Sequence, residues 1–413
     1  MFLLGRMLQM LIRRGALAVI GPDGRLRTYG DGGPPAVTLR IADAATARRI
    51  FFNPGLAVGE AYMNGKISIE SGDIFEFLDL AIANLGWGTP TSVVSFNQFM
   101  VAIGRRIAQY NPISRSRRNV AHHYDLSDTL YSLFLDGDQQ YSCAYYLSPH
   151  DSLDQAQEQK KRHIASKLLL RPGLKVLDIG SGWGGLGLYL ARETGVQVTG
   201  LTLSREQLKV SNRRAADAGL SDRVRFELLD YREAAGRYDR IVSVGMFEHV
   251  GVGFYKTYFE KVRDLLTDDG VALIHTIGRA DGPGSTNAWI RKYIFPGGYS
   301  PALSEVMPVI EQTGLYLTDV EILRLHYAET IRAWRRRFNT NRRRVAEIYD
   351  ERFCRMWEFY LAASEATFRH GGHVNFQIQI SKKVDAVPLT RDYMVDWERA
   401  RSATRSRSAS AAE

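Results

Sequence analysis

The chain has 413 residues, enough for two domains, and its 45% of hydrophobic residues is typical of a folded protein with a sizeable core. No uninterrupted apolar run reaches about 18 residues, so we expect no membrane-spanning helix. The two cysteines, Cys143 and Cys354, are too few for a disulfide framework and favour a cytoplasmic protein, while the net charge of +9 favours an anionic partner.

The first 110 residues are predicted to form a smaller α+β domain without a recognisable catalytic constellation. Residues 1–14 carry apolar side chains at helical spacing with arginines between them, which predicts a helix that docks on the core or lies in a membrane interface. Asp43 and Asp73 are typical helix caps. The other expected elements are a turn at Gly21–Gly24 between two strands, a third strand over 36–41, and helices over 43–52 and 73–85.

Residues 111–395 are predicted to form a second domain, in which strands alternate with helices. Such alternation is typical of an α/β fold, a doubly wound parallel sheet whose ligands bind beyond the carboxyl ends of the strands. The Ser/Ala/Arg-rich tail, residues 396–413, is predicted to be disordered. The expected strands are 175–179, 196–203, 224–229, 239–244 and 270–277, with helices over 205–218 and 254–265.

The most informative segment is Val176–Gly185, where a buried strand ends in Asp178 and is followed by a glycine turn and the start of a helix. Gly180 and Gly182 let backbone N–H groups approach a ligand, and the helix N-terminus adds a positive dipole end, which fits a nucleotide-derived cofactor. A nicotinamide enzyme would carry an acid at the end of the next strand, about 20 residues further on, but that strand ends in Thr202-Leu203-Ser204. The pattern therefore favours S-adenosylmethionine over a dinucleotide.

The other strand ends bring further polar residues to the same crevice. Gln207 lies one turn into the helix after the second strand, and Asp230, followed by Tyr231, can accept a hydrogen bond from an adenine amino group. Glu248 follows the fourth strand and His275 lies near the end of the fifth. A carboxylate and an imidazole that approach one crevice from different strands favour a functional role over a structural one.

Five motifs in chain order together resemble the cyclopropane fatty acid synthase family. They are Tyr141–Tyr146, the glycine turn, Gly245–Gly251, Ile274–Gly278, and His326-Tyr327 with Trp334 downstream. The resemblance extends from His122 to Lys383, and the segment His122–Asp125 is similar to a lid over the cofactor. It implies a class I methyltransferase sheet with helical lid insertions that cover a lipid tunnel.

The resemblance implies two adjoining sites. S-adenosylmethionine, the methyl donor, is expected at Tyr141, Ser142, Gly180, Thr202, Leu203, Gln207, Asp230 and Tyr231, to which the glycine turn adds Asp178 and Gly182. Bicarbonate is expected at Cys143, Glu248, His275, Ile277 and Tyr327. Cys143 and Ile277 are expected to contribute mainly backbone groups. A free thiolate beside a sulfonium would risk alkylation, so Cys143 is not expected to be a nucleophile, and no metal site is predicted.

The reaction that the resemblance implies is methylene transfer to a cis double bond in an acyl chain of membrane phospholipid. A cyclopropane ring forms through a carbocation that bound bicarbonate quenches by removing a proton. The rings of Tyr145 and Tyr327 are candidates for stabilising the cation. Loss of a different proton would yield a methylene- or methyl-branched acyl chain, and the sequence does not separate the two outcomes.

Positive charge concentrates between Arg332 and Arg355, where nine arginines outnumber three acids. An anionic membrane surface suits this segment, although a solvated helix face is the usual fate of such a run. Nucleic acid is not expected as a partner, because no Asn/Asp-Pro-Pro-Tyr/Phe motif follows the fourth strand. We expect a cytoplasmic protein peripherally associated with the inner membrane surface. The sequence leaves open whether the N-terminal domain captures lipid or contacts a second copy in a homodimer.

Overall fold

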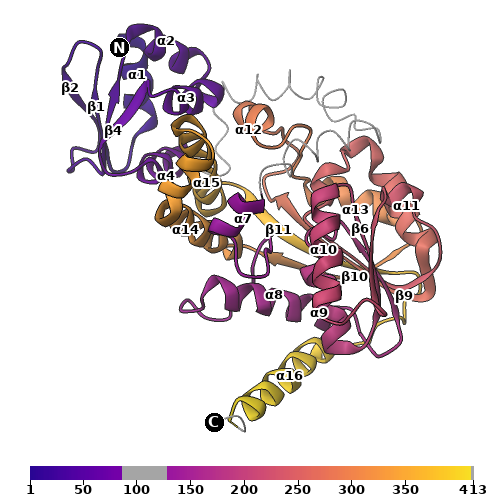
Figure 1. Cartoon of the computed structure of the whole chain (residues 1–413). Helices are drawn as coiled ribbons and strands as arrows, with labels where there is room; N and C mark the ends of the chain where they lie inside the picture. Colours follow the sequence, from indigo (N-terminus) through magenta and orange to yellow (C-terminus); the bar gives the residue numbers. More distant parts are fainter. Residues whose placement is uncertain (86–127, 411–413) are drawn as a thin grey trace.

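The computed structural model describes residues 1–85 and 128–410, with side chains as far as Arg401 (Figure 1). The expected domain boundary between residues 110 and 111 and the expected lid at His122–Asp125 lie outside the described residues. Among the described helices, none combines the length and the apolar composition that a membrane span requires.

The N-terminal unit is a four-stranded sheet with the strand order β2-β1-β3-β4. Asp43 and Asp73 cap helices as predicted, because their carboxylates accept hydrogen bonds from the N–H groups of Thr46 at 2.7 Å and of Glu76 at 2.8 Å. The elements are α1 (Phe2–Leu11), β1 (Ala16–Ile20), β2 (Leu26–Gly30), β3 (Val37–Ile41), α2 (Ala44–Phe52), α3 (Pro54–Met63), β4 (Ile67–Ser71) and α4 (Ile74–Leu85).

Helix α1 docks on the protein's own core, which is one of the two arrangements predicted for it. Leu4 and Leu8 are buried within the helix, and Ile12 is buried at its end. The opposite edge of the helix remains in solvent, since Phe2 is 74% and Met10 is 72% exposed. The helix therefore anchors the N-terminal unit with one apolar face and leaves a second apolar edge exposed.

The second unit is a seven-stranded sheet with the strand order β10-β11-β9-β8-β5-β6-β7. Strands β5 to β9 pair in parallel as predicted, but β11 runs antiparallel to both of its neighbours, so the sheet is mixed. The strands are β5 (Lys175–Ile179), β6 (Gln197–Thr202), β7 (Val224–Leu228), β8 (Tyr238–Val244), β9 (Leu266–Arg279), β10 (Tyr316–Leu323) and β11 (His373–Ser381). The last two strands were not expected from the sequence.

Helices cover both faces of this sheet (Figure 1). Side chains of β5 alternate between two cores: Val176 packs with α8, α9 and α10, whereas Leu177 packs with α11 and α13. The helices are α7 (Asp128–Phe134), α8 (Leu153–Lys167), α9 (Gly185–Thr194), α10 (Arg205–Asp217), α11 (Tyr255–Leu265), α12 (Ala288–Tyr293), α13 (Leu303–Gln312), α14 (His326–Ile348), α15 (Glu351–His370) and α16 (Asp392–Ser410), with short 3-10 turns η1 (Tyr231–Glu233), η2 (Phe247–His249) and η3 (Val252–Phe254). The strands are thus buried on both faces, as in a doubly wound fold.

The two units share one hydrophobic core that runs from α1 to α15. In Figure 1, α15 lies directly beside α4 of the N-terminal unit. Polar contacts close the same interface: the Tyr62 hydroxyl donates to Glu358 at 3.1 Å, and the Lys292 ammonium lies 2.7 Å from Glu60. The N-terminal unit is therefore packed against the elements that border the site.

The chain is helical as far as Ser410, where disorder was predicted for residues 396–413. Trp397 packs against the hydrophobic cluster that includes residues of α8 and α9, and the Glu398 carboxylate lies 2.7 Å from Nδ1 of His163 on α8. Composition alone suggested disorder because the tail is rich in small and charged residues. These two contacts anchor the start of a segment whose alanines and arginines favour a helix.

Candidate active site

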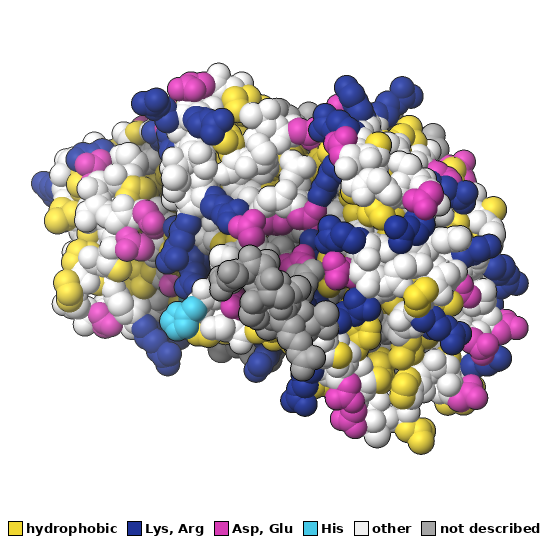
Figure 2. All heavy atoms as spheres, turned by 60° about the horizontal axis from the view of Figure 1, so that its bottom comes forward, with side chains coloured by type: hydrophobic (Ala, Val, Ile, Leu, Met, Phe, Trp, Pro, Cys, Tyr) yellow, Lys and Arg dark blue, Asp and Glu magenta, His cyan; other side chains and the backbone are white. Residues whose placement is uncertain are grey.

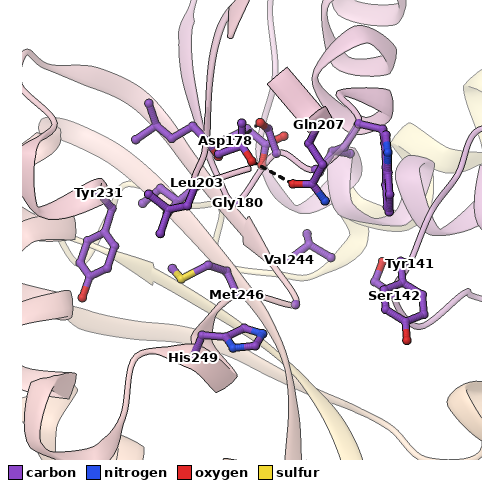
Figure 3. Close-up of a pocket in the computed structure, with 18 of the residues that line it drawn as sticks. Tyr141, Ser142, Asp178, Gly180, Leu203, Gln207, Tyr231, Val244, Met246 and His249 are labelled. Carbon is purple, nitrogen blue, oxygen red and sulfur yellow. Dashed lines mark hydrogen bonds between the residues drawn. The ribbon is translucent and has the colours of Figure 1, made fainter. Parts of the chain in front are cut away.

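The carboxyl ends of the central strands open into a cavity of about 1130 Å³, counting its mouth. We call it the cofactor cavity. All ten residues predicted to bind S-adenosylmethionine line it, and Figure 3 shows several of them around one space. They come from the segment before α8, from the end of β5 and the turn after it, and from the ends of β6 and β7 with the starts of α10 and η1 that follow them: Tyr141, Ser142, Asp178, Gly180, Gly182, Thr202, Leu203, Gln207, Asp230 and Tyr231.

The glycine turn requires glycine for two different reasons. Gly180 has a φ of +86°, and a Cβ atom there would lie 2.8 Å from Cβ of Met246. Gly182 also has a positive φ, +55°, but a Cβ atom there would meet no described atom within 4 Å. Gly180 thus permits close packing of the chain, whereas Gly182 keeps free a space at the cavity wall.

Two polar pairs shape the far side of the cofactor cavity. The Thr202 hydroxyl donates to Oε1 of Gln207 at 2.8 Å, the dashed line in Figure 3, and this bond orients the amide. The Asp230 carboxylate accepts hydrogen bonds from Nε and Nη2 of Arg232 at 2.8 and 2.7 Å. A carboxylate offers about four lone-pair positions, so Asp230 can still bind an adenine amino group while it holds Arg232.

Asp178 is a buried acid, 1% exposed, at the end of β5. Burial raises its pKa to about 7. Its Oδ2 has no hydrogen-bond partner within residues 1–85 and 128–401, although buried polar atoms are normally paired. An unpaired acceptor on a cavity of this size fits a ligand with cationic and N–H groups, as S-adenosylmethionine has.

A second cavity of about 670 Å³ adjoins the first. We call it the reaction cavity. The two cavities share four lining residues: Tyr141, Ser142, Gly245 and His249. All five residues predicted around bicarbonate line the reaction cavity: Cys143, Glu248, His275, Ile277 and Tyr327. The fold therefore joins the two sequence-predicted sites along one wall.

Glu248 lies in η2 and is held by the neighbouring strand β9. Its Oε1 accepts a hydrogen bond from the Ile277 N–H at 2.6 Å, whereas its Oε2 has no partner among the described residues. Burial raises the pKa of Glu248 to about 7. Ile277 was expected to contribute mainly a backbone group at the anion. Its N–H donates to Glu248 and so orients that carboxylate, and Ile277 also lines the reaction cavity.

His275 on β9 is 1% exposed, and burial lowers its pKa to about 3, so the imidazole is neutral. Its Nδ1 lies 3.1 Å from the amide nitrogen of Gln377 on β11. Its Nε2, on the other side of the ring, has no partner in the described part of the chain. Asn375, also on β11, lines the same cavity, and its Oδ1 has no partner among the residues that the structure describes.

The aromatic and thiol groups have distinct surroundings. Cys143 is fully buried, and burial raises the pKa of its thiol far above the usual range, which agrees with a packing role. Tyr327 packs its ring 4.8 Å from that of Phe368 and lines the reaction cavity. Tyr145 lines neither cavity; it is stacked between His163 and His326 at 4.0 and 4.7 Å, so both faces of its ring are covered and the predicted cation contact is wrong.

The sequence did not reveal the buried Lys160. Its ammonium donates to Oε1 of Gln140 at 2.5 Å and to the Ser142 hydroxyl at 2.9 Å, and burial lowers its pKa to about 8. These bonds hold the segment on which both cavities meet. Lys160 lies within a helix rich in charged residues, a composition typical of a solvated helix, and only its fully buried position in the fold distinguishes it.

The sheet order with its single reversed strand, and the glycine turn after β5, define a class I S-adenosylmethionine-dependent methyltransferase. The family model described as mycolic acid cyclopropane synthetase matches residues 112–378, and the chain belongs to this family. A second model, described as a domain of unknown function, matches residues 8–86.

Several curated and solved proteins are similar over most of their length. The cyclopropane-fatty-acyl-phospholipid synthase of Escherichia coli K12 is 37% identical over 357 residues, which are 86% of this chain and 90% of that protein. Tuberculostearic acid methyltransferase of Mycobacterium tuberculosis is 35% identical over 387 residues, 87% of each chain. The structure of mycolic acid cyclopropane synthase CmaA1 complexed with SAH and CTAB has a TM-score of 0.62 and 32% identity, and covers 66% of this chain and 99% of that one.

Proposed function

We propose that this enzyme transfers a methylene group from S-adenosylmethionine to the cis double bond of a phospholipid acyl chain, forming a cyclopropane ring. The observation that carries the proposal is a set of buried polar atoms on the reaction cavity without partners among the described residues: Oε2 of Glu248, Nε2 of His275 and Oδ1 of Asn375. Such atoms are rare unless a ligand completes their hydrogen bonds. The names of the similar proteins support a lipid substrate.

We propose bicarbonate as the ion that these atoms hold. Bicarbonate has one O–H group and several acceptor oxygens, so it can donate to Glu248 and accept from a protonated ring nitrogen of His275. Because the pKa of Glu248 is about 7, this carboxylate can accept or return a proton near neutral pH at little cost. When bound, bicarbonate would supply the base for removing a proton from the transferred methyl group.

The chain's own residues position and protect the reacting groups. S-adenosylmethionine would supply an electrophilic methyl group, and an isolated alkene attacks it only when it is held in line. Tyr141 and Ser142 line both cavities, so they lie where donor and acyl chain would meet. Ile290, Phe295 and the ring of Tyr327 give the reaction cavity apolar walls, which exclude water from a cation.

The test is incubation of the full-length enzyme with S-adenosylmethionine and vesicles of monounsaturated phospholipid, followed by mass spectrometry and proton NMR of the lipids. We expect a mass gain of one CH2 with loss of the alkene signal and appearance of cyclopropane protons. A branched methyl or methylene signal would replace the proposed ring product by the alternative branched acyl chain. No lipid product at all would overturn the proposed function.

We propose that the enzyme contacts the membrane surface through α1 rather than mainly through the arginine-rich segment. Six of the nine arginines between Arg332 and Arg355 are already in ion pairs with acids of the chain. On the face drawn in Figure 2, basic and acidic side chains are likewise interspersed. The exposed edge of α1 instead combines Phe2, Leu3 and Met10 with basic Arg6.

Flotation with anionic vesicles tests this surface. We expect Phe2→Ser with Met10→Ser to weaken vesicle binding at least tenfold, since each buried apolar side chain contributes about 1.5–3 kcal/mol. High salt is expected to reduce the binding that remains. Leu389→Ser, which replaces an even more exposed apolar residue between β11 and α16, is the control and should bind as the wild type does. Equal loss in both variants would contradict a specific role of α1.

A further inference from the structure

Strand β11 carries a row of amide side chains where a buried strand would normally be apolar. Asn375, Gln377 and Gln379 alternate with apolar residues, and all three are at most 1% exposed. Gln377 lies directly opposite His275 in the antiparallel pairing of β11 with β9. Burying an amide is energetically costly unless its donors and its acceptor form hydrogen bonds. The hydrogen-bond partners of Gln377 therefore indicate its structural role.

The orientation of the Gln377 amide follows from its other partner. The Lys167 ammonium of α8 donates to Oε1 of Gln377 at 2.7 Å, and Lys167 is fully buried. An ammonium has donors and no acceptor, so the amide oxygen must face Lys167 and the amide nitrogen must face His275. The two flipped orientations of an amide are normally hard to distinguish, but here the neighbouring ammonium permits only one of them.

The tautomer of His275 follows in turn. The amide nitrogen of Gln377 can only donate, so Nδ1 of His275, 3.1 Å away, must accept and carries no proton. In a neutral imidazole the proton then resides on Nε2. This is the nitrogen that has no partner among the residues described, on a side chain that lines the reaction cavity.

Lys167 is in turn held in place by charged groups. It forms an ion pair with Glu321 of β10, and the same carboxylate lies 2.7 Å from Nε2 of His163. Nδ1 of His163 lies 2.7 Å from Glu398 on α16. A chain of polar contacts therefore runs from the C-terminal helix to His275. It is partly buried at its two carboxylates, Glu398 and Glu321, and fully buried at Lys167 and Gln377.

We propose that Lys167 and Gln377 are positioning residues that lock His275 in the Nε2–H tautomer, so that it offers a hydrogen-bond donor to the reaction cavity. The consequence for catalysis rests on the proposed function, because an anion such as bicarbonate needs that donor. The opposite tautomer would direct a lone pair at the anion. Hydrogen bonds to charged groups contribute about 1.5–3 kcal/mol, so its loss should lower turnover by about 10–100-fold.

The test reads the tautomer directly, by NMR of the full-length protein labelled with ¹⁵N in histidine, with His275→Asn to assign the signals. In the wild type we expect an unprotonated Nδ1 and a protonated Nε2. Gln377→Glu replaces the amide donor by an acceptor, so Nδ1 should become protonated. Lys167→Met should release the amide and give a mixture. A wild-type ring protonated on Nδ1 would overturn the proposal without any variant.

Gln379→Glu is the matched control, since Gln379 lies on the same face of β11 and donates to the Lys167 backbone oxygen instead of touching His275. It should leave the His275 signals unchanged. Gln377→Glu should also lower kcat for methylene transfer about 10–100-fold with unchanged affinity for SAH. A changed tautomer with wild-type kcat would overturn the catalytic role. Absence of lipid product in every protein, with the expected tautomers, would instead reject the proposed function alone.

Discussion

Replacing Glu248 with Gln is expected to lower the turnover of methylene transfer by about 10²–10⁴-fold, the usual contribution of a positioned acid–base group. The amide can still accept the Ile277 N–H, so the local fold should persist. It cannot take up a proton, and it directs an NH2 group at the place where Oε2 has no partner among the described residues. Turnover is measured by transfer of labelled methyl groups from S-adenosylmethionine to vesicle lipids, and the affinity for SAH by calorimetry.

The matched control is Glu260→Gln on α11, which makes the same chemical change on a side chain that is 40% exposed. We expect wild-type turnover from it. For Glu248→Gln the affinity for SAH should stay within about twofold, because Glu248 lines only the reaction cavity. Near-normal turnover of this variant would contradict the proposed role of Glu248 in holding the base.

The same variant should carry a signature in stability. The pKa of Glu248 is about 7 in the fold, above the value of about 4.3 for an exposed glutamate. The Glu248 carboxyl therefore contributes to the free energy of unfolding at low pH, and this contribution is lost as the pH rises from about 4 to about 7. The amide introduced by Glu248→Gln does not titrate. As the pH is raised from ~5 to ~8, the free energy of unfolding of this variant should therefore rise by about 1–3 kcal/mol relative to that of the wild type. Denaturant unfolding at both pH values measures this, and parallel pH curves would contradict the raised pKa.

Replacing Gly182 with Leu is expected to weaken S-adenosylmethionine binding by about 10–100-fold or more, since filling a packed site costs about 1–3 kcal/mol. A Cβ atom at Gly182 would meet no described atom within 4 Å, and Gly182 lines the cofactor cavity, so a leucine side chain there would occupy space at the cavity wall. The positive φ of +55° adds strain that does not depend on the ligand.

Gly219→Leu separates the two effects. Gly219 follows α10 and has a φ of +63°, and a Cβ atom there would likewise meet no described atom within 4 Å, but Gly219 does not line the cofactor cavity. Both variants should lose similar stability in thermal unfolding, while only Gly182→Leu should lose affinity for SAH in calorimetry. Equal affinities would show that Gly182 serves the backbone turn and not the ligand.

Much of the site followed from local sequence signals. The turn after β5 requires positive φ values at Gly180 and Gly182, and such constraints act within a few residues. Parallel strands bring their carboxyl ends to one edge of the sheet, so the sequence alone predicts that Asp178, Asp230 and Glu248 lie in one crevice. Topology and local conformation sufficed there.

Contacts between distant segments were beyond such reasoning. His275 and Gln377 are 102 residues apart, and they meet only because β11 reverses direction beside β9. The tail at residues 396–413 was predicted to be disordered from its composition, but α16 continues through it as far as Ser410. There Trp397 packs against the hydrophobic cluster that includes residues of α8 and α9, and Glu398 contacts His163 of α8.

From the sequence alone came the class of cofactor, the strand ends predicted to bind it and the family that the motifs resemble. These depend on periodicity, caps and backbone conformation, which are properties of neighbouring residues. Tertiary structure alone decided that the Ile277 N–H holds Glu248, that Tyr145 is stacked away from the cavities, and which nitrogen of His275 carries its proton. Those outcomes depend on which distant residues the fold brings together. A buried polar group must be hydrogen-bonded, and its partner decides how it is oriented and which of its atoms donates.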